Sequence, residues 1–223
     1  MEISDDSMRT KLRKIPVLKG SSQDAHLDAM PDTPQEAFSI WLDKAIEEGV
    51  TEPHAMTLST VDENGWPDAR VLILKNVDYR GWHFAIKADS PKGQQISNNQ
   101  HVALTFYWPQ QARQIRLRGS AIQLPEKECT EDFTARPASS KISAMASKQS
   151  QVLGTSDELQ KSLVEAKSIL DKDPTLIMPG WKVYAVTPDV VEFWQGKSDR
   201  LHERLQYTRT TGNQSWERKA LWP

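Results

Sequence analysis

The sequence predicts an α+β fold in which an antiparallel sheet forms a barrel and the helices lie at its periphery. Strand-like segments follow one another through short turns, and helical segments are inserted between groups of strands rather than after each one. The chain contains no dinucleotide-binding fingerprint, no phosphate-loop motif and no internal repeat. Its 223 residues suffice for one large domain or two small ones. We predict a flexible arm over 1–30 and a single folded domain over 31–223.

The first well-marked element is a helix that begins after Thr33. Thr33 and Glu36 have the spacing of a capping box, and Pro34 occupies the first helical position. Gly49 is expected to end this helix. The residues before it are polar and irregular in pattern, which favours an arm.

Alternating or β-branched patterns then predict most of the sheet, with a helix over 90–98 that opens on Ser-Pro. The expected strands of this part are 55–61, 69–75, 82–87, 101–108 and 113–124. Further helices are expected at 126–135, 140–147 and 156–171. The last segments are strands at 181–186 and 190–194, a break at 187–189 between them, and a hairpin made of ERLQYTR, a GNQ turn and WERKALW.

Composition excludes several classes of function. The net charge is -2, with 28 basic and 30 acidic residues, which argues against a general binder of nucleic acid or of membrane surfaces. A single cysteine, Cys129, excludes an internal disulfide and a cysteine-rich metal site, and fits a reducing, cytoplasmic compartment. No apolar run reaches the roughly 18 residues that span a bilayer, and no signal peptide is expected.

Polar residues gather in two segments without fixing a function by themselves. The segment 132–151 combines cations, hydroxyls and amides near predicted helix starts, which suits either a phosphate site or a set of helix caps. Near the C-terminus, Arg200 and Arg204 flank His202, and Trp194 precedes them. Like charges on one face repel unless an anion or an electron-rich ring lies between them, so this segment suggests a ligand.

Five stretches together resemble the pyridoxine (pyridoxamine) 5′-phosphate oxidase family. They occur in the family's order and spacing, and the resemblance extends from about Thr33 to Pro223. The stretches are RVLILK (70–75), SPKGQQISNN (90–99), RQIRLRG (113–119), ARPASSKISAMASKQS (135–150) and EFWQGKSDRLHER (192–204).

The resemblance implies a split β-barrel homodimer that binds FMN at the subunit interface. It implies hydride transfer from the 4′ carbon of pyridoxine or pyridoxamine 5′-phosphate to FMN, which dioxygen reoxidises, with pyridoxal 5′-phosphate as product. The implied FMN-binding residues are Arg70, Val71, Leu72, Lys75, Lys92, Gln114, Gln149, Ser150, Trp194 and Arg204. The implied substrate-binding residues are Lys75, Arg136, Ser140, Arg200 and His202, of which Arg200 and His202 would act in catalysis, and no metal is implied.

Three departures from the family pattern bear on this expectation. Asp132 stands where the family usually has a tyrosine that binds the substrate phosphate. Pro91 replaces the arginine of an Arg-Lys pair on the flavin phosphate, and Ala85-Ile86 replaces a Tyr-Thr pair. We expect the vitamin B6 phosphate reaction. The alternatives are an FMN-dependent oxidase of another ring, as in the phenazine pathway, and a non-enzymatic flavin- or pyridoxal-phosphate-binding protein.

Overall fold

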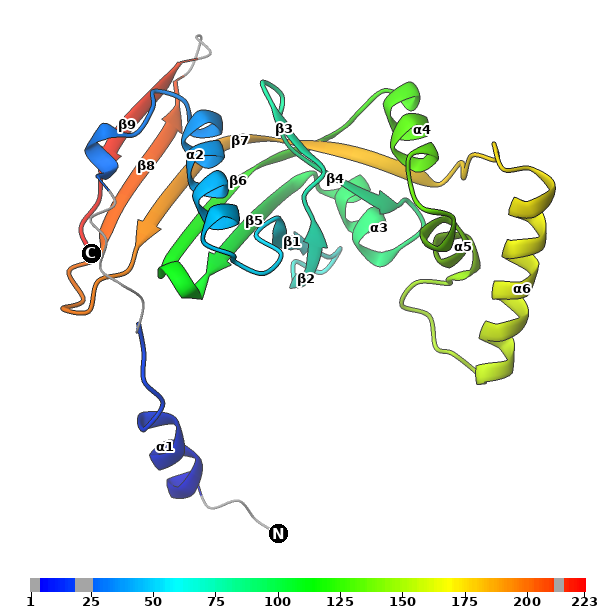
Figure 1. The fold of residues 1–223 in the computed structure, drawn as a ribbon, viewed down its shortest axis with the longest axis horizontal. Coiled ribbons are helices and arrows are strands. Elements are labelled where there is room, and N and C mark those ends of the chain that lie inside the picture. The colour runs from blue at the N-terminus through cyan, green and yellow to red at the C-terminus, as the bar shows by residue number, and fades with distance from the viewer. Residues whose placement is uncertain (1–4, 19–25, 211–214) are drawn as a thin grey trace. The chain divides into compact units, whose positions relative to one another are not determined.

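The computed structural model describes residues 5–18, 26–210 and 215–223 (Figure 1). The chain divides into two compact units. Unit 1 comprises Met1–His54, Thr105–Arg116 and Val190–Pro223, and unit 2 comprises Ala55–Leu104 and Leu117–Asp189. The prediction of a single domain over 31–223 therefore stays a prediction.

The sheet is antiparallel wherever its register is defined, which confirms the predicted α+β class. In the described part of the chain the strand order is β2-β1-β5-β6-β7-β4-β3, and β8 pairs with β7 and β9. β5 (His101–Trp108), β6 (Arg113–Gln123) and β7 (Trp181–Gln195) each contribute residues to both units. No helix among the described residues has the length and apolar character that crossing a bilayer requires.

Unit 2 carries two antiparallel strand pairs at the start of its chain. β1 (Ala55–Val61) pairs with β2 (Pro67–Ile73), and β3 (Asn76–Asp78) pairs with β4 (Gly81–Lys87). β4 also pairs with the first part of β7, where Lys87 lies opposite Trp181. The last residue of β4 is thereby placed beside the first residue of β7.

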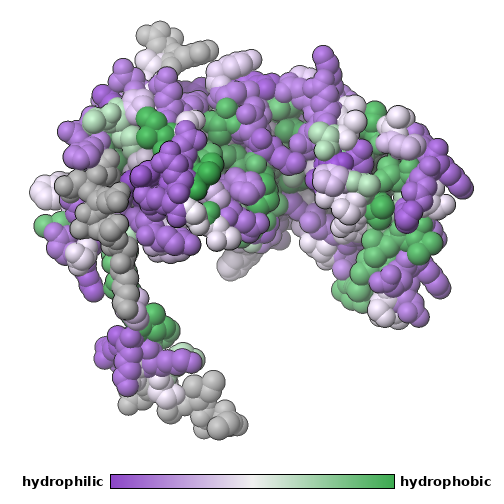
Figure 2. All heavy atoms as spheres, in the orientation of Figure 1, coloured by the Kyte–Doolittle hydropathy of each residue, from purple (hydrophilic) through white to green (hydrophobic). Residues whose placement is uncertain are grey.

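The helices of unit 2 are α3 (Pro91–Asn98), α4 (Glu126–Thr134), α5 (Ala138–Ala146) and α6 (Ser156–Lys172). Figure 1 shows α4, α5 and α6 gathered at one end of this unit. Figure 2 shows hydrophobic surface around α6, where Val152, Leu153 and Leu159 are exposed. Ala85 packs against both of the small cores beneath α4 and α5, one centred on Cys129 and Val183 and the other on Phe133 and Trp181. The small side chain at 85 therefore belongs to the packing of this end of the sheet.

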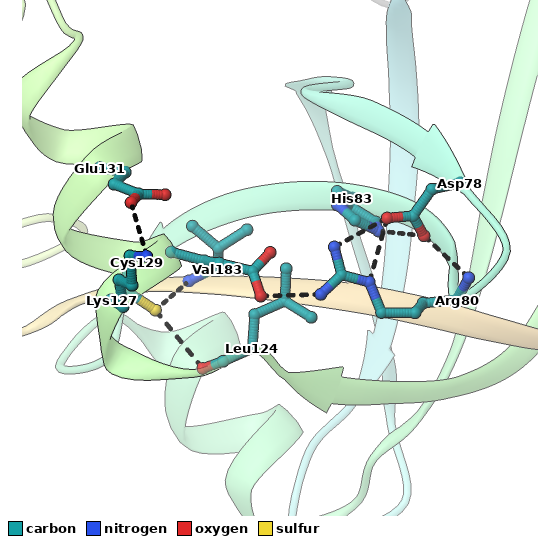
Figure 3. A network of polar contacts seen from close by, with 9 residues as sticks. Asp78, Arg80, His83, Leu124, Lys127, Cys129, Glu131 and Val183 are labelled. Atoms are coloured by element: carbon teal, nitrogen blue, oxygen red, sulfur yellow. Dashed lines mark hydrogen bonds and ion pairs between the residues drawn. The ribbon is translucent and has the colours of Figure 1, made fainter.

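A half-buried polar network links β3 and β4 to α4 (Figure 3). Arg80 donates hydrogen bonds to Asp78 at 2.7 Å and to Glu128 at 2.8 Å, and the His83 ring lies 3.1 Å from Asp78. Burial lowers the pKa of His83, although the Asp78 carboxylate opposes this effect. Because Glu128 belongs to α4, these bonds hold the helix that carries Asp132 against the sheet.

Unit 1 is built around α2 (Pro34–Glu47), with Thr33 as its N-cap and Gly49 at φ 71° after its end, as predicted. Aromatic side chains of α2 form its core: the Trp41 ring lies 5.2 Å from that of Phe193 in β7. β8 (Glu203–Arg209) pairs with the end of β7 and with β9 (Trp216–Ala220), which confirms the predicted hairpin strands. The GNQ turn of that hairpin lies outside the described residues.

Three predicted features differ from the structure. Within 1–30 there is a helix, α1 (Asp5–Arg13), and a short 3-10 turn, η1 (Leu27–Ala29), whose Leu27 is buried. The irregular structure expected for the whole of this stretch is therefore wrong within the described residues. β3 was not predicted, since three residues are too few for a pattern.

The break expected at 187–189 is also wrong, because β7 continues through Pro188. Two glycines of neighbouring strands approach its backbone here. A Cβ on Gly81 would lie 1.9 Å from the carbonyl oxygen of Val186, and one on Gly119 would lie 2.1 Å from that of Thr187. Tertiary packing against these glycines keeps the strand continuous where local sequence favours a turn.

Candidate functional site

Three cations and an amide gather near the start of α3, and we call Arg70, Lys87, Lys92 and Gln149 the Lys92 cluster. The two lysines are buried, Arg70 is half-buried and Gln149 is exposed. Lys92 is only 6 % exposed, and its Nζ donates a hydrogen bond to Gln149 Oε1 at 2.8 Å. Arg70 extends from β2 and donates to Thr60 Oγ1 at 2.6 Å. The family resemblance placed Arg70, Lys92 and Gln149 in one cofactor set. In unit 2, Lys92 contacts Gln149 and lies near enough to Arg70 for its charge to act on it.

Within the described residues, the positive charge of Lys92 has no carboxylate partner, unlike those of Arg70 and Lys87. Burial lowers the pKa of Lys92, and the positive charges of Arg70 and Lys87 lower it further. Arg70 pairs with Asp68, and Lys87 lies 3.8 Å from Asp89, but Lys92 forms no ion pair within the described residues. A buried cation without a counter-charge is costly, so the cluster is suited to binding an anion.

A second charged group joins the end of β2 to α4, and we call Lys75, Asp132, Arg136, Ser140 and Trp181 the Asp132 cluster. Lys75 Nζ lies 3.2 Å from Asp132 Oδ1, and Trp181 Nε1 donates to Asp132 Oδ2 at 2.8 Å. The Arg136 guanidinium lies 4.2 Å from the centre of the Trp181 ring and donates to the carbonyl oxygen of Ser140 at 3.1 Å. Asp132 thus faces the cations of the cluster.

Asp132 changes the electrostatics of this second cluster. Burial lowers the pKa of Arg136, and the Asp132 carboxylate opposes this effect. Arg136 Nε is buried and has no hydrogen-bond partner among the described residues. The cluster therefore contains a buried donor without a partner, and part of its positive charge is already neutralised by its own carboxylate.

A third set of predicted residues lies in unit 1. The rings of Trp194 and His202 are 4.8 Å apart, and the backbone N–H of Lys197 donates to His202 Nδ1 at 3.1 Å. This bond places the proton of a neutral His202 ring on Nε2. Arg200 has φ 67°, the left-handed region, in the turn between β7 and β8.

Arg204 is held by neighbours within unit 1. Its Nε donates to Glu192 Oε1 and its Nη1 to the carbonyl oxygen of Trp222, both at 2.9 Å. The hydrogen bond to Glu192 raises the pKa of Arg204. A cavity of about 400 Å³ lies beside it, lined by His202, Arg204 and residues of η1 and the C-terminus. The side chains of His202 and Arg204 thus both line a cavity of a size that can hold a small ligand.

For the four remaining residues predicted to bind FMN, the structure gives the position in a strand or turn and, within the described residues, no side-chain contact that bears on the site. Val71 is exposed and Leu72 half-buried next to Arg70 on β2, Gln114 lies on β6, and Ser150 has φ 68° directly after Gln149. The sequence prediction missed Lys87 and Trp181. The signal for Lys87 was a lysine closing the apolar strand WHFAIK, whereas Trp181 had none beyond its apolar character. No cluster of metal-ligating side chains occurs among the described residues.

Comparison with known proteins identifies the family. The model of the family described as pyridoxamine 5′-phosphate oxidase matches residues 42–169, and the model of the pyridoxine 5′-phosphate oxidase C-terminal dimerisation region matches residues 181–223. A pyridoxine/pyridoxamine 5′-phosphate oxidase of Salinibacter ruber is 40 % identical over 197 residues, which cover 88 % of this chain and 92 % of the relative. The enzyme of the same name from Haemophilus influenzae is 39 % identical over 206 residues, covering 91 % and 93 %.

Solved structures confirm the predicted split-barrel class. PhzG from Burkholderia lata, solved with tetrahydrophenazine-1-carboxylic acid, has a TM-score of 0.83 and 28 % identity, and covers 92 % of this chain and 99 % of its own. A pyridoxamine 5′-phosphate oxidase-related FMN-binding protein of Nostoc punctiforme has a TM-score of 0.70 at 17 % identity, with 87 % and 100 % covered, and supports the fold alone. Together with the family matches, these comparisons show that the chain belongs to the pyridoxamine 5′-phosphate oxidase family of oxidoreductases.

Proposed function

We propose that this protein is an FMN-dependent oxidase that converts pyridoxine or pyridoxamine 5′-phosphate to pyridoxal 5′-phosphate, with dioxygen as the electron acceptor. The observation that carries the proposal is the Lys92 cluster. It holds buried cations beside an amide, and Lys92 has no carboxylate partner within the described residues. Family membership supports the phosphate of FMN as the anion that would complete this cluster.

The residues present fit FMN. Lys92 and Arg70 would bind its phosphate, with Gln149 and Ser150 beside them, because cations and polar groups at a helix start favour a dianion. Val71, Leu72, Lys75, Gln114, Trp194 and Arg204 complete the proposed FMN set. When bound, FMN would supply the redox chemistry by accepting a hydride and passing the electrons to dioxygen.

The chain's own residues would bind and orient the substrate. Lys75, Arg136 and Ser140 would hold its phosphate, and the guanidinium of Arg136 already lies beside Ser140, to whose carbonyl oxygen it donates. Arg200 and His202 would lie against the pyridine ring. With Nδ1 accepting from the Lys197 N–H, a neutral His202 presents Nε2–H to the substrate and would act there as a hydrogen-bond donor that holds the ring in place.

The proposal includes a homodimer in which two chains complete each FMN site, and a cytoplasmic location. The C-terminal dimerisation region over residues 181–223 supports the dimer, and it contains Trp194, Arg200, His202 and Arg204. The single buried Cys129 is compatible with a reducing compartment.

A second function is oxidation of a different ring, of the phenazine type. The observation that favours it is the ion pair of Asp132 with Lys75, since a pocket with less positive charge suits a phosphate dianion poorly. PhzG, similar over nearly the whole chain, is bound to a carboxylic acid, which carries one negative charge where a phosphate carries two.

Oxygen consumption by the FMN-loaded protein tests the proposal. We expect both pyridoxine 5′-phosphate and pyridoxamine 5′-phosphate to be oxidised, with one peroxide and one pyridoxal 5′-phosphate formed per dioxygen. Turnover of a reduced phenazine carboxylic acid, with neither B6 phosphate oxidised, would favour the second function. If no substrate releases peroxide from the flavin-loaded protein, it is a flavin-binding protein without oxidase activity.

A further inference from the structure

We propose that Lys87 is a second cation of the flavin-phosphate site and takes the place of the cation that is missing at Pro91. The inference rests on the proposed function for the identity of the anion. It rests on the structure for the position of Lys87, which none of the comparisons singles out.

Lys87 and Lys92 are held together by the start of α3. Ser90 donates its hydroxyl to the carbonyl oxygen of Lys87 at 2.7 Å and, as N-cap, accepts from the backbone N–H of Gly93. Gly93 permits the close approach, since a Cβ at this position would lie 2.6 Å from the carbonyl oxygen of Lys87. The helix start is therefore packed directly on the end of β4, with a lysine on each side of the contact.

The two ammonium groups point into the same polar region. Lys87 Nζ donates to the backbone carbonyl of Ser147, and Lys92 Nζ donates to the side chain of Gln149 two residues later. Lys87 is 7 % exposed and Lys92 is 6 % exposed. The segment 147–149 thus bridges the two lysines, and it continues to Ser150 of the proposed FMN set.

The positive charge of Lys87 acts on Lys92. The charge of Lys87 contributes to the lowered pKa of Lys92, in the same direction as Arg70. The carboxylate near Lys87 is that of Asp89, at 3.8 Å, and its side chain is 70 % exposed, so solvent weakens its compensation. Two buried cations near one another are stabilised when an anion binds between them, as a phosphate dianion would.

Because residue 91 is a proline, α3 supplies one cation fewer to the proposed phosphate site than the family pattern would, and a second cation would have to come from another element. Proline at the first position suits the helix start, because its fixed φ and missing N–H cost nothing there. It carries no charge, however, so α3 itself supplies Lys92 alone. Lys87, the last residue of β4, restores a second positive charge close to the same helix start.

Paired affinities for FMN and riboflavin test the role of Lys87, because riboflavin lacks only the phosphate. In Lys87→Met we expect the dissociation constant for FMN to rise about tenfold to a hundredfold, the usual loss of a hydrogen bond to a charged group, and that for riboflavin to stay unchanged. Lys87→Arg should retain most of the FMN affinity. Lys182→Met is the matched control, since Lys182 lies on the neighbouring strand and pairs with Glu126 at 2.7 Å.

The outcomes separate the inference from the proposed function. If wild type binds neither flavin, the proposed function fails. If Lys87→Met weakens FMN and riboflavin equally, or weakens neither, Lys87 has no role at the phosphate and the inference is overturned. Loss of FMN affinity in Lys87→Met that Lys87→Arg reverses, with riboflavin binding intact, supports it.

Discussion

The Lys92 cluster and the Asp132 cluster lie in the same unit and are built from similar side chains, yet they differ in how their charge is balanced. Lys92 is buried with an amide partner and further cations, and within the described residues no carboxylate pairs with it. Lys75 of the Asp132 cluster has a carboxylate 3.2 Å away, which Trp181 holds in place. The number of cations in a cluster therefore does not by itself determine how well it suits an anion, because a neighbouring carboxylate can neutralise them.

The difference in charge has different consequences for cofactor and substrate. At about 4 Å and an effective dielectric near 20, two like unit charges repel by roughly 4 kcal/mol before screening. A phosphate near Asp132 meets such repulsion, whereas a phosphate near Lys92 relieves the repulsion among cations. FMN binding is therefore the more firmly supported part of the proposed function, and the ring substrate is the part on which Asp132 acts.

The largest effect is expected from Lys92→Met. Removing this cation should weaken FMN binding about tenfold to a hundredfold, because a charge-assisted contact worth about 1.5–3 kcal/mol is lost. Riboflavin affinity should not change, and turnover of protein saturated with FMN should change little. Fluorescence titration of both flavins measures this. Equal FMN affinity in wild type and variant would show that the phosphate binds elsewhere, and the Lys92 cluster would then no longer count as an anion site.

The next effect concerns Asp132→Tyr. We expect the Michaelis constant for pyridoxine 5′-phosphate to fall about tenfold, because a phenolic donor is gained and a carboxylate near the phosphate is lost. Asp132→Asn, which keeps the shape and an acceptor for Trp181, should give part of this effect. The flavin absorbance spectrum should be the same in all three proteins. A constant that neither substitution moves would mean that the substrate's anion does not use this cluster.

A smaller effect is expected from pH. The pKa of Lys92 in the folded protein is below its ordinary value of 10.5, because burial and neighbouring cations disfavour the charged form. The protonated lysine binds phosphate, so the contribution to FMN affinity is present below the lowered pKa and is lost as pH rises through it. Titrations at increasing alkaline pH should show affinity falling before 10.5 in wild type, with a shallower fall in Lys92→Met. The same pH dependence in both proteins would contradict an anion site at Lys92.

The sequence predicted local features well where a short pattern determines them. The Thr33 cap, the Pro34 start and most strands follow from residues a few positions apart. Arg70, Lys92 and Gln149 were expected at the cofactor from resemblance, and the structure places Lys92 in contact with Gln149 and within electrostatic reach of Arg70. The continuity of β7 through Pro188 was not predictable, because it depends on Gly81 and Gly119 from other strands.

Charge balance was the part of the site that sequence could not determine. Asp132 was recognisable as unusual, but its orientation depends on Trp181 and Lys75, which lie far from it in the chain. Lys87 appeared to be the end of a strand, and only the packing of α3 on β4 shows that it shares a region with Lys92. The orientation of Asp132 and the proximity of Lys87 to Lys92 both depend on tertiary packing, which the spacing of residues along the chain does not reveal.

The most direct test of the account is the ratio of wild-type affinities for FMN and riboflavin, measured side by side on apoprotein. Two or three charge-assisted contacts to the phosphate predict that FMN binds at least about a hundredfold more tightly than riboflavin. The holoprotein should also be yellow and dimeric. Equal affinities for the two flavins, or no binding of either, would contradict the claim that the Lys92 cluster is a site for the flavin phosphate.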